Sequence, residues 1–346
     1  MSVKYMFFND YSEGMHPKIL ELMIATNLIQ ENGYGEDSIS KQASQLIKDV
    51  TKSQNSDVHF VSGGTQANLI VLSSLLKPYE SVISTSTGHI NVHEAGAIEA
   101  TGHRINAVDT KDGKLTVNDI KQVVESHTDE HMVKPRVVFV SNSTEVGTIY
   151  TKNELETISQ YCHQNNLYLY LDGARIGSGI TSKDSDLTLE DIARLVDVFY
   201  IGGTKNGALL GEAIVIPNRE LQPNFRYNLK QHGALLAKGR ALGVQFLALF
   251  TDGLFFELAK HANSMAEKLT NGIKELGYSF QTDSTTNQIF PILPNSVIEK
   301  LKADYGFYVW SKIGDNLSSI RLVTSWATKE EMVDEFIGDL KLVSEK

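Results

Sequence analysis

Cysteine is almost absent from this sequence, which holds a single one, Cys162, among its 346 residues. One cysteine excludes an intramolecular disulfide and a cysteine-rich metal site, as is usual in a reducing compartment, and we predict no metal site. Long hydrophobic runs are also missing, since none approaches the ~20 residues of a membrane span. The N-terminal stretch MSVKYMFFND lacks the apolar segment and the cleavage site of a signal peptide. We therefore expect a cytoplasmic protein with no membrane partner.

Positive charge is in deficit as well. The formal net charge of −10 at pH 7 argues against nucleic acid or an anionic membrane as a partner. No internal repeat, low-complexity stretch or flexible linker interrupts the chain. The hydrophobic share of 41% is enough to fill the core of a large domain and of a smaller one.

Short β runs alternate with helical segments between about residues 57 and 217. This alternation predicts an α/β fold with a mainly parallel sheet covered by helices on both faces. The predicted strands lie near 58–61, 81–84, 104–108, 136–140, 167–171, 196–201 and 212–216. The sequence Thr-Lys-Asn-Glu at 151–154 predicts a capping box and the start of a crossover helix.

The rest of the chain divides into two further parts. An amphipathic pattern predicts a long helix over 253–276, followed by short strands in QIFPIL, FYVW and SIRLVT and by a closing helix from about Lys329. We therefore expect an N-terminal segment at 1–56, a large domain at 57–250 and a smaller α+β domain at 251–346.

Two apolar strands of the large domain end in charged residues. Asp172 ends YLYLD, and Lys205 follows DVFYIGGT, 33 positions further along the chain. This separation is about one strand–helix–strand unit, and ligands bind at the carboxyl ends of such strands. Pyridoxal phosphate needs an amine for a Schiff base and an acid to keep its ring nitrogen protonated, so Lys205 and Asp172 suit it. Taken singly, a surface lysine and a helix-capping aspartate would be the simpler interpretation.

A phosphate needs a cradle of its own, and VSGGTQANLIVL provides a candidate. Gly63 and Gly64 let the backbone approach an anion, Thr65 adds a hydroxyl, and a helix N-terminus follows. By itself this stretch could equally be an ordinary strand-to-helix turn.

Seven segments together resemble a known family, the low-specificity threonine aldolases, within the β-eliminating lyase group of fold-type I pyridoxal-phosphate enzymes. The resemblance spans nearly the whole chain. The segments are NDYSEGMHP (9–17), YGED (34–37), SGGTQAN (62–68), GHINVHEAGA (88–97), LDGARIG (171–177), GGTKNGALLGEA (202–213) and IRLVTSW (320–326).

The resemblance implies a role for several residues. Lys205 would hold the cofactor, Asp172 would pair with its ring nitrogen, and His89 would stack on the ring; these three are the predicted catalytic residues. The residues predicted to bind the cofactor are Gly63, Gly64, Thr65, His89, Asp172, Arg175, Thr204 and Lys205. Those predicted to bind the substrate are Asn9, Tyr34, Arg175 and Arg321, the two arginines holding its carboxylate, with Tyr34 near a site that belongs to a neighbouring subunit.

Three positions depart from the family pattern. Asn9 replaces a serine that helps to hold the substrate carboxylate. Thr144, in SNSTEVG, stands near the place of a histidine that is a candidate for handling the β-hydroxyl proton, so Glu145, His93 or a water would take that role. Leu236 replaces an arginine that reaches the phosphate, for which Lys238 or Lys230 could substitute.

The implied activity is cleavage of L-threonine, L-allo-threonine or a related β-hydroxy-α-amino acid to glycine and an aldehyde. The alternative is β-elimination or transamination of another amino acid by a related fold-type I enzyme. Active sites of this fold usually lie at a dimer interface, so we expect a homodimer or homotetramer in which residues 1–56 pack against another subunit. In the simpler alternative, these residues wrap their own domain.

Overall fold

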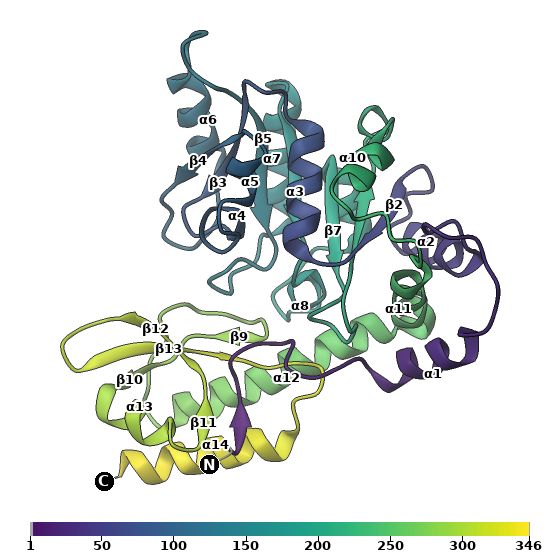
Figure 1. Cartoon of the computed structure of the whole chain (residues 1–346). Helices are drawn as coiled ribbons and strands as arrows, with labels where there is room; N and C mark the ends of the chain where they lie inside the picture. The colour runs from purple at the N-terminus through teal and green to yellow at the C-terminus, as the bar shows by residue number, and fades with distance from the viewer. Residues whose placement is uncertain (1–2, 346) are drawn as a thin grey trace.

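A computed structural model describes residues 3–345 of the chain, and its centre is a seven-stranded sheet (Figure 1). The strand order is β2-β8-β7-β6-β5-β3-β4, and only β8 runs antiparallel to its neighbours. The mainly parallel α/β sheet predicted from the sequence is confirmed, and every predicted strand overlaps an observed one. The strands are β2 (Asp57–Val61), β3 (Glu80–Thr85), β4 (Arg104–Val108), β5 (Lys134–Ser141), β6 (Tyr168–Asp172), β7 (Val198–Gly202) and β8 (Glu212–Ile216).

Helices cover both faces of this sheet, and local capping signals fix where several of them begin. The capping box predicted at Thr151 and Glu154 is present, and Thr116–Asp119 and Thr188–Asp191 form two more. The helices of the large domain are α3 (Gly64–Leu75), α4 (His89–Val92), α5 (Ala97–Ala100), α6 (Val117–Ser126), α7 (Lys152–Gln164), α8 (Ile176–Ile180), α9 (Leu189–Leu195), α10 (Phe225–Gln231) and α11 (Arg240–Phe250), with the 3₁₀ turn η1 (Arg219–Leu221).

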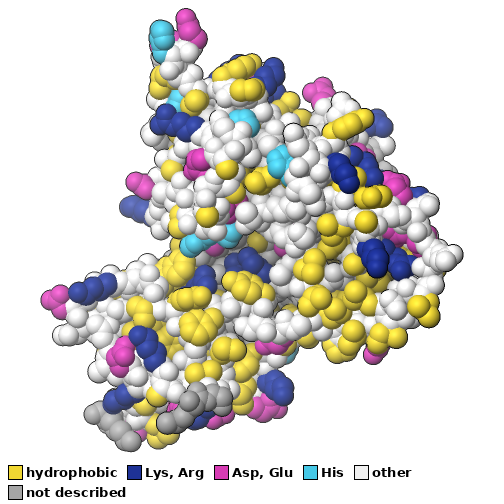
Figure 2. Space-filling model, viewed as in Figure 1, with side chains coloured by type: hydrophobic (Ala, Val, Ile, Leu, Met, Phe, Trp, Pro, Cys, Tyr) yellow, Lys and Arg dark blue, Asp and Glu magenta, His cyan; other side chains and the backbone are white. Residues whose placement is uncertain are grey.

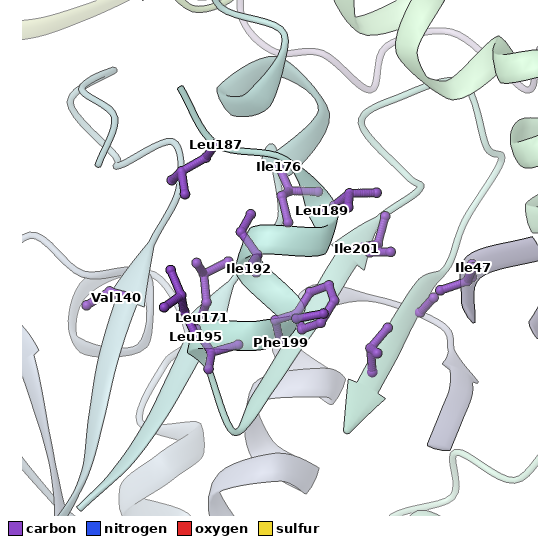
Figure 3. Packing of buried hydrophobic residues seen from close by; sticks show 14 of the residues in the cluster. Ile47, Val140, Leu171, Ile176, Leu187, Leu189, Ile192, Leu195, Phe199 and Ile201 are labelled. Carbon is purple, nitrogen blue, oxygen red and sulfur yellow. The ribbon is translucent and has the colours of Figure 1, made fainter. Parts of the chain in front are cut away.

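The core of the large domain is split by the sheet into two layers. One layer packs α6, α7, α9 and α11 against strand residues such as Leu171 and Phe199, and Figure 3 shows part of it. The other layer packs α3, α5 and α10 against the opposite side chains of the same strands, among them Tyr170 and Tyr200. Alternate residues of β6 and β7 thus face opposite layers, as pleated strands require.

The smaller domain begins with a long helix, α12 (Leu254–Glu275), which runs from below the large domain into the small one (Figure 1). It holds a four-stranded sheet with the path β10-β13-β12 and β9 paired to β13. Its elements are α12 (Leu254–Glu275), β9 (Gln288–Ile289), β10 (Ile292–Pro294), α13 (Asn295–Leu301), β11 (Tyr305–Gly306), β12 (Tyr308–Lys312), β13 (Leu317–Val323) and α14 (Glu330–Ser344). The predicted long helix, short strands and closing helix are all observed.

The N-terminal segment is shared between the two domains of its own chain. Its first strand, β1 (Tyr5–Met6), pairs in parallel with β11, and Phe7 is buried in the core of the small domain. Its helices α1 (Pro17–Thr26) and α2 (Ser38–Val50) lie against α11 instead, where Ile47 is buried. One side of the segment therefore wraps its own domains, as in the simpler alternative.

The stretch Arg240–Glu275 is long and apolar enough to cross a membrane by length and composition alone. The sequence analysis did not anticipate such a stretch. It is not one straight helix, because the turn η2 (Thr251–Gly253) separates α11 from α12 and Asp252 has a positive φ of 52°. In its most apolar window, 61% of the residues are buried inside the protein. The apolar side chains of this stretch, such as Phe246 and Phe255, thus serve the core.

Candidate active site

The carboxyl ends of the parallel strands meet above one cavity of about 530 Å³ between the two domains. Figure 2 shows a hollow between the two lobes with histidine and basic side chains on its walls. The loops that follow β3, β5, β6 and β7 each contribute to the lining, and β12 and β13 close it from the small domain. The lining residues are Tyr11, His89, His93, Glu145, Arg175, Lys205, Tyr308, Val309, Trp310 and Arg321.

Asp172 lies at the end of β6 with its carboxylate fully enclosed by donors. Oδ1 accepts hydrogen bonds from the hydroxyl of Tyr200 at 2.5 Å and from the backbone N–H of Ala174 at 2.9 Å. Oδ2 accepts one from Nδ2 of Asn68 at 3.2 Å. Three donors fix the orientation of a carboxylate that is only 3% exposed, as a partner for a ring nitrogen must be fixed.

A chain of hydrogen bonds links Asp172 to His89. Nδ2 of Asn68 also donates to Oε1 of Glu94 at 2.7 Å, and the same oxygen lies 2.7 Å from Nδ1 of His89. Burial by itself would lower the pKa of His89, but the bond to Glu94 and the charges of Glu145 and Asp172 together outweigh it, so the pKa is raised. Two of the predicted catalytic residues, Asp172 and His89, are thus held by one buried network.

Lys205 follows β7 in a loop whose preceding residues are hydrogen-bonded to a second buried acid, Glu212. Glu212 accepts from the backbone N–H of Gly203 at 2.9 Å and from the hydroxyl of Thr204 at 3.0 Å. Burial raises the pKa of Glu212 to about 7, against the opposing charge of Lys205. Burial and the charge of Arg175 lower the pKa of the Lys205 amine. A lowered pKa favours the neutral amine, which is the form that attacks a carbonyl carbon.

Thr204, predicted to contact the cofactor, uses its hydroxyl inside this loop. The oxygen donates to Glu212 and accepts from the backbone N–H of Gly211 at 2.9 Å. Thr204 therefore shapes the loop that carries Lys205.

Gly63 and Gly64 form the N-terminus of α3, directly after β2. A side chain added at Gly63 would meet no atom within 4 Å, so the space beside this backbone is open. The next residue, Thr65, is exposed, and the first N–H groups of any helix lack intrahelical partners. An open space in front of free N–H groups fits a phosphate, as predicted. Together with the amine of Lys205 and the enclosed carboxylate of Asp172, the residues present fit pyridoxal phosphate.

Arg175 is paired with an acid that the sequence did not reveal. Its Nε donates to Oδ2 of Asp10 at 2.7 Å and its Nη2 donates to Oδ1 at 3.0 Å, a bidentate pair. Burial alone would raise the pKa of Asp10, but the charges of Arg175 and Lys205 and hydrogen bonds from Arg175 and Asn287 lower it. Arg175 lines the cavity, and its position is fixed by Asp10.

Arg321 reaches the same cavity from β13. Its Nη2 donates to the backbone oxygen of Phe8 at 3.2 Å, whereas its Nε is buried without a hydrogen-bond partner. Arg175 and Arg321 thus place two guanidinium groups on the cavity that Lys205 also lines. Two guanidinium groups at one cavity suit it to an anion.

The three positions considered for the β-hydroxyl proton separate clearly. The hydroxyl of Thr144 lies 2.7 Å from that of Thr148 and is buried away from the cavity, whereas Glu145 and His93 line it. Burial lowers the pKa of His93, and the neighbouring His89, Arg321 and Lys205 add to this effect against the opposing Glu145. Nitrogen with a lowered pKa is neutral at pH 7 and can accept a proton.

Two residues predicted to bind the substrate, Asn9 and Tyr34, and Leu236, which replaces the family's phosphate-binding arginine, do not line the cavity within the described part of this chain. The side-chain oxygen of Asn9 accepts from the backbone N–H of Tyr11 at 2.9 Å and from Ser12 at 3.0 Å, which makes it a turn residue. Tyr34 lies at a different hollow, of about 590 Å³, with Lys230 Nζ 4.9 Å from the centre of its ring. Leu236 is 37% exposed.

Several residues at the site carried no sequence signal of their own. Asn68 and Glu94 lie inside segments that resemble the family, yet nothing local shows that they touch. Asp10 meets Arg175 across 165 residues of chain. The one available hint to these contacts is that Tyr170 and Tyr200 lie within apolar strands, because a buried tyrosine hydroxyl needs a polar partner.

Comparison with known proteins gives a consistent result. Residues 10–295 match the β-eliminating lyase family. The low specificity L-threonine aldolase of Pseudomonas aeruginosa is 34% identical over 340 residues, and that of a Pseudomonas species is 33% identical over 343, each match covering 97% of both chains. The solved structure of Leishmania major threonine aldolase shares 51% identity, with a TM-score of 0.97 over 98% of this chain and 99% of that one.

More distant structures show the fold alone. A Thermus thermophilus aspartate aminotransferase is 14% identical and superposes with a TM-score of 0.71, covering 99% of this chain and 91% of its own. Fold, site and relatives agree that this is a fold-type I enzyme and that its cofactor is pyridoxal phosphate. The chain therefore belongs to the β-eliminating lyase family, as a pyridoxal-phosphate-dependent lyase in the group of the low-specificity L-threonine aldolases.

Proposed function

We propose that the protein cleaves L-threonine, L-allo-threonine or a related β-hydroxy-α-amino acid into glycine and an aldehyde. The observation that carries this proposal is the content of one cavity. It combines the amine of Lys205 with two arginines suited to a single carboxylate and with a neutral imidazole, His93. An amino acid with a hydroxyl on its β-carbon has a partner for each of these groups.

The cofactor supplies an electron sink that stabilises negative charge at the substrate α-carbon. Lys205 would hold it covalently, and the N–H groups at Gly63 and Gly64 would bind its phosphate. Asp172, fixed by Tyr200, Ala174 and Asn68, would keep a proton on the ring nitrogen. His89 would lie against the ring, oriented by Glu94.

The substrate carboxylate would bind between Arg175 and Arg321. Asp10 holds two nitrogens of Arg175 and so fixes its plane, while Arg321 keeps a buried Nε without a protein acceptor. Clamping the carboxylate would fix how the bonds of the substrate α-carbon are oriented, and this orientation would decide which of them breaks. The arginines therefore select the reaction as well as the substrate.

We assign the proton of the β-hydroxyl to His93. Thr144 is turned away from the cavity, and His93 is neutral at pH 7 because its pKa is lowered. Changing His93 to Asn should lower kcat by roughly 10²-fold, the lower end of what a general base contributes. A matched Glu145→Gln variant should lose much less. The assignment fails if the two variants lose activity in the reverse order.

Substrate screening tests the proposed reaction. Threonine, allo-threonine and phenylserine should each release an aldehyde and an equal amount of glycine, with no ammonia. Release of ammonia and a keto acid in place of glycine would instead support the alternative, β-elimination or transamination. The β-substituent that gives the highest kcat/KM identifies the preferred substrate.

We also propose that the active protein is a homo-oligomer in which Tyr34 serves a neighbouring subunit's cavity. Hydrophobic side chains gather over α1 and α11 in Figure 2, and several are exposed. The exposed hydrophobic residues of α1 and of the stretch directly after it are Leu20, Ile24, Leu28 and Ile29. An apolar surface of this kind is typical of an interface. Tyr34 and Lys230 lie together at the hollow beside it, which suits a pair that reaches another chain.

Subunit mixing tests this arrangement. Light scattering on dilute, active protein should give the mass of a dimer or tetramer, and an active monomer would refute the proposal. Inactive Lys205→Ala and inactive Tyr34→Ala subunits, once mixed, should regain activity, because hybrid dimers hold one intact site. No recovery after confirmed subunit exchange would place Tyr34 outside the neighbouring site.

We propose a cytoplasmic location on composition alone. The chain is acidic, and its one cysteine, Cys162, is a free and buried thiol. Cell fractionation tests the location, and recovery of the protein in a membrane or secreted fraction would overturn it.

A further inference from the structure

Arg321 lies among aromatic side chains at the cavity. The centre of its guanidinium is 5.2 Å from the centre of the Tyr308 ring and 5.1 Å from the centre of the Trp310 ring. Each of these rings contacts a further ring, since Phe8 meets Tyr308 edge to face at 4.8 Å and Phe290 meets Trp310 at 5.3 Å. Two aromatic rings thus lie beside Arg321, and each is itself supported by another ring.

An irregularity in the small sheet brings Tyr308 and Trp310 close to Arg321. Tyr308 of β12 stands directly opposite Arg321 of β13, and the register then shifts between Val309 and Ser311. Trp310 is the extra residue at this bulge, so it has no partner of its own on β13. One ring thus comes from the position opposite Arg321 and the other from the unpaired residue two places along.

The two rings serve the cavity more than the core. Tyr308 is 49% exposed, and neither ring belongs to the buried cluster that holds the small domain together. Both line the cavity with Arg321. Two rings beside a long, flexible side chain restrict its movement, and they do so without neutralising its charge.

The charge of Arg321 is left open toward the cavity. The guanidinium has five N–H donors, of which one reaches the backbone oxygen of Phe8. Its Nε is buried without an acceptor. No carboxylate of the described residues lies within 4.0 Å of Arg321, whereas Arg175 has Asp10. A buried donor without a partner is costly, so an acceptor brought by a ligand would satisfy it.

We propose that Tyr308 and Trp310 are positioning residues that hold Arg321 ready to receive the α-carboxylate of the amino-acid substrate. This inference rests on the proposed function, in which Arg321 binds that carboxylate. The bulge at Trp310 is then part of the binding site. Because the rings make no demand on the rest of the substrate, they act on every α-amino acid that enters, whatever its β-substituent.

Fluorescence can test this position directly, because the chain has two tryptophans. The second, Trp326, packs against His16 at 5.4 Å and does not line the cavity, so Trp326→Phe leaves Trp310 as the sole reporter. In the Trp326→Phe holoenzyme and apoprotein, glycine should change the emission of Trp310 saturably. Ethanolamine, which has the amine but no carboxylate, should not, and adding Arg321→Gln should remove the glycine response. Emission that ignores glycine, or that responds equally to ethanolamine, would overturn the proposal.

Kinetics provide the second test. Trp310→Leu and Tyr308→Leu should each raise KM about tenfold, which corresponds to about 1.4 kcal/mol, with kcat changed less than threefold. Trp310→Phe and Tyr308→Phe should restore KM to within about threefold, since a phenyl ring keeps the contact. Ile313→Ala is the matched control, because Ile313 is 45% exposed, lies just beyond β12 and does not line the cavity.

The outcomes separate this inference from the proposed function. An unchanged KM in both Leu variants, or a fall in kcat and melting temperature that Phe does not rescue, would show that the rings are only structural. If no β-hydroxy-amino acid yields an aldehyde, the proposed function fails. The carboxylate-dependent emission of Trp310 would still decide whether Arg321 is the receptor held by these two rings.

Discussion

The two walls of the cavity are built on opposite principles. The inner wall comes from the large domain. It consists of His89, which lines the cavity, and of Glu94, Asn68 and Asp172 behind it, each hydrogen-bonded to the next. The outer wall, Arg175 and Arg321, joins the end of β6 to the small domain, and Arg321 keeps a buried donor without an acceptor. Lys205 lies between the two walls.

This difference matches what each wall must bind. The inner wall is held by hydrogen bonds within this chain, although Oε2 of Glu94 is buried without a partner among the described residues, so it offers a fixed environment to a group that stays bound. The outer wall carries excess positive charge, which a passing carboxylate neutralises. The paired network therefore suits the resident cofactor, and the open one suits a substrate that must also leave.

The largest effect is expected at the residue between the walls. Lys205→Ala removes the only amine that lines the cavity within the described chain, so turnover and the yellow colour of the bound cofactor should both disappear. Borohydride reduction of the native protein followed by peptide mapping checks the assignment. Labelling of any other lysine would contradict it.

Within the inner wall, the ring partner should matter most. Asp172→Asn keeps the size of the side chain but cannot hold a proton on the cofactor ring, so the rate should fall on the order of 10²-fold while the cofactor stays bound. Absorbance and kcat measured on the same sample separate binding from rate. Tyr200→Phe, which removes one of three donors to Asp172, is the milder control. Near-normal turnover in Asp172→Asn would rule out its role.

The stability of the protein should depend on pH through Glu212, which holds the loop of Lys205. The pKa of Glu212 is raised to about 7, so between its ordinary value of 4.5 and 7 the folded chain holds a proton that the unfolded chain has released. Stability therefore falls as pH rises through this range. The glutamine in Glu212→Gln does not titrate, so the free energy of unfolding of this variant should rise relative to that of the wild type between pH 4.5 and pH 8. The full pKa shift would correspond to about 3 kcal/mol, and we expect a relative gain of about 2 kcal/mol. Urea unfolding of the two apoproteins at both pH values measures this gain, and parallel curves would contradict it.

Features with a local signal are predictable from the sequence. A charged residue at the end of an apolar strand marks Asp172 and Lys205, whose roles stay predictions, and adjacent residues mark the helix start at Thr151 and Glu154, which is confirmed. The parallel sheet followed from the alternation of strands and helices. Each of these features depends on a few neighbouring positions, so one sequence is enough to predict it.

The rest depends on contacts between distant segments. Asp10 and Arg175 are far apart in the chain, and a sequence does not show that an arginine expected at the substrate is also paired with an acid. Trp310 meets Arg321 only because of a bulge that no residue type announces. The hydroxyl of Thr204 turned toward Glu212 for the same reason, since the loop geometry decides it. The proposed contact of Tyr34 with a neighbouring subunit involves a second chain, which one sequence cannot position.

The smallest effect concerns the link between Asp172 and His89, and it tests whether the inner wall acts as a unit. Glu94 accepts from both Asn68 and His89 on one oxygen, and its pairing raises the pKa of His89 although burial opposes this. Glu94→Gln keeps the shape and loses the charge, so the pKa of His89 should fall, with about tenfold lower kcat at neutral pH. The raised pKa stabilises the fold below the ordinary value of 6.5, and this contribution is lost as pH rises through the folded value. The variant should therefore be least stable relative to the wild type in acid.

NMR titration measures the change in the pKa of His89, and a His89→Gln variant identifies its signal among those of the ten histidines. Glu145→Gln, which removes a charge at the cavity without a bond to His89, should shift it less. An unmoved pKa in Glu94→Gln would mean that His89 is held by something other than this network, and the contrast between a closed inner wall and an open outer one would lose its strongest link.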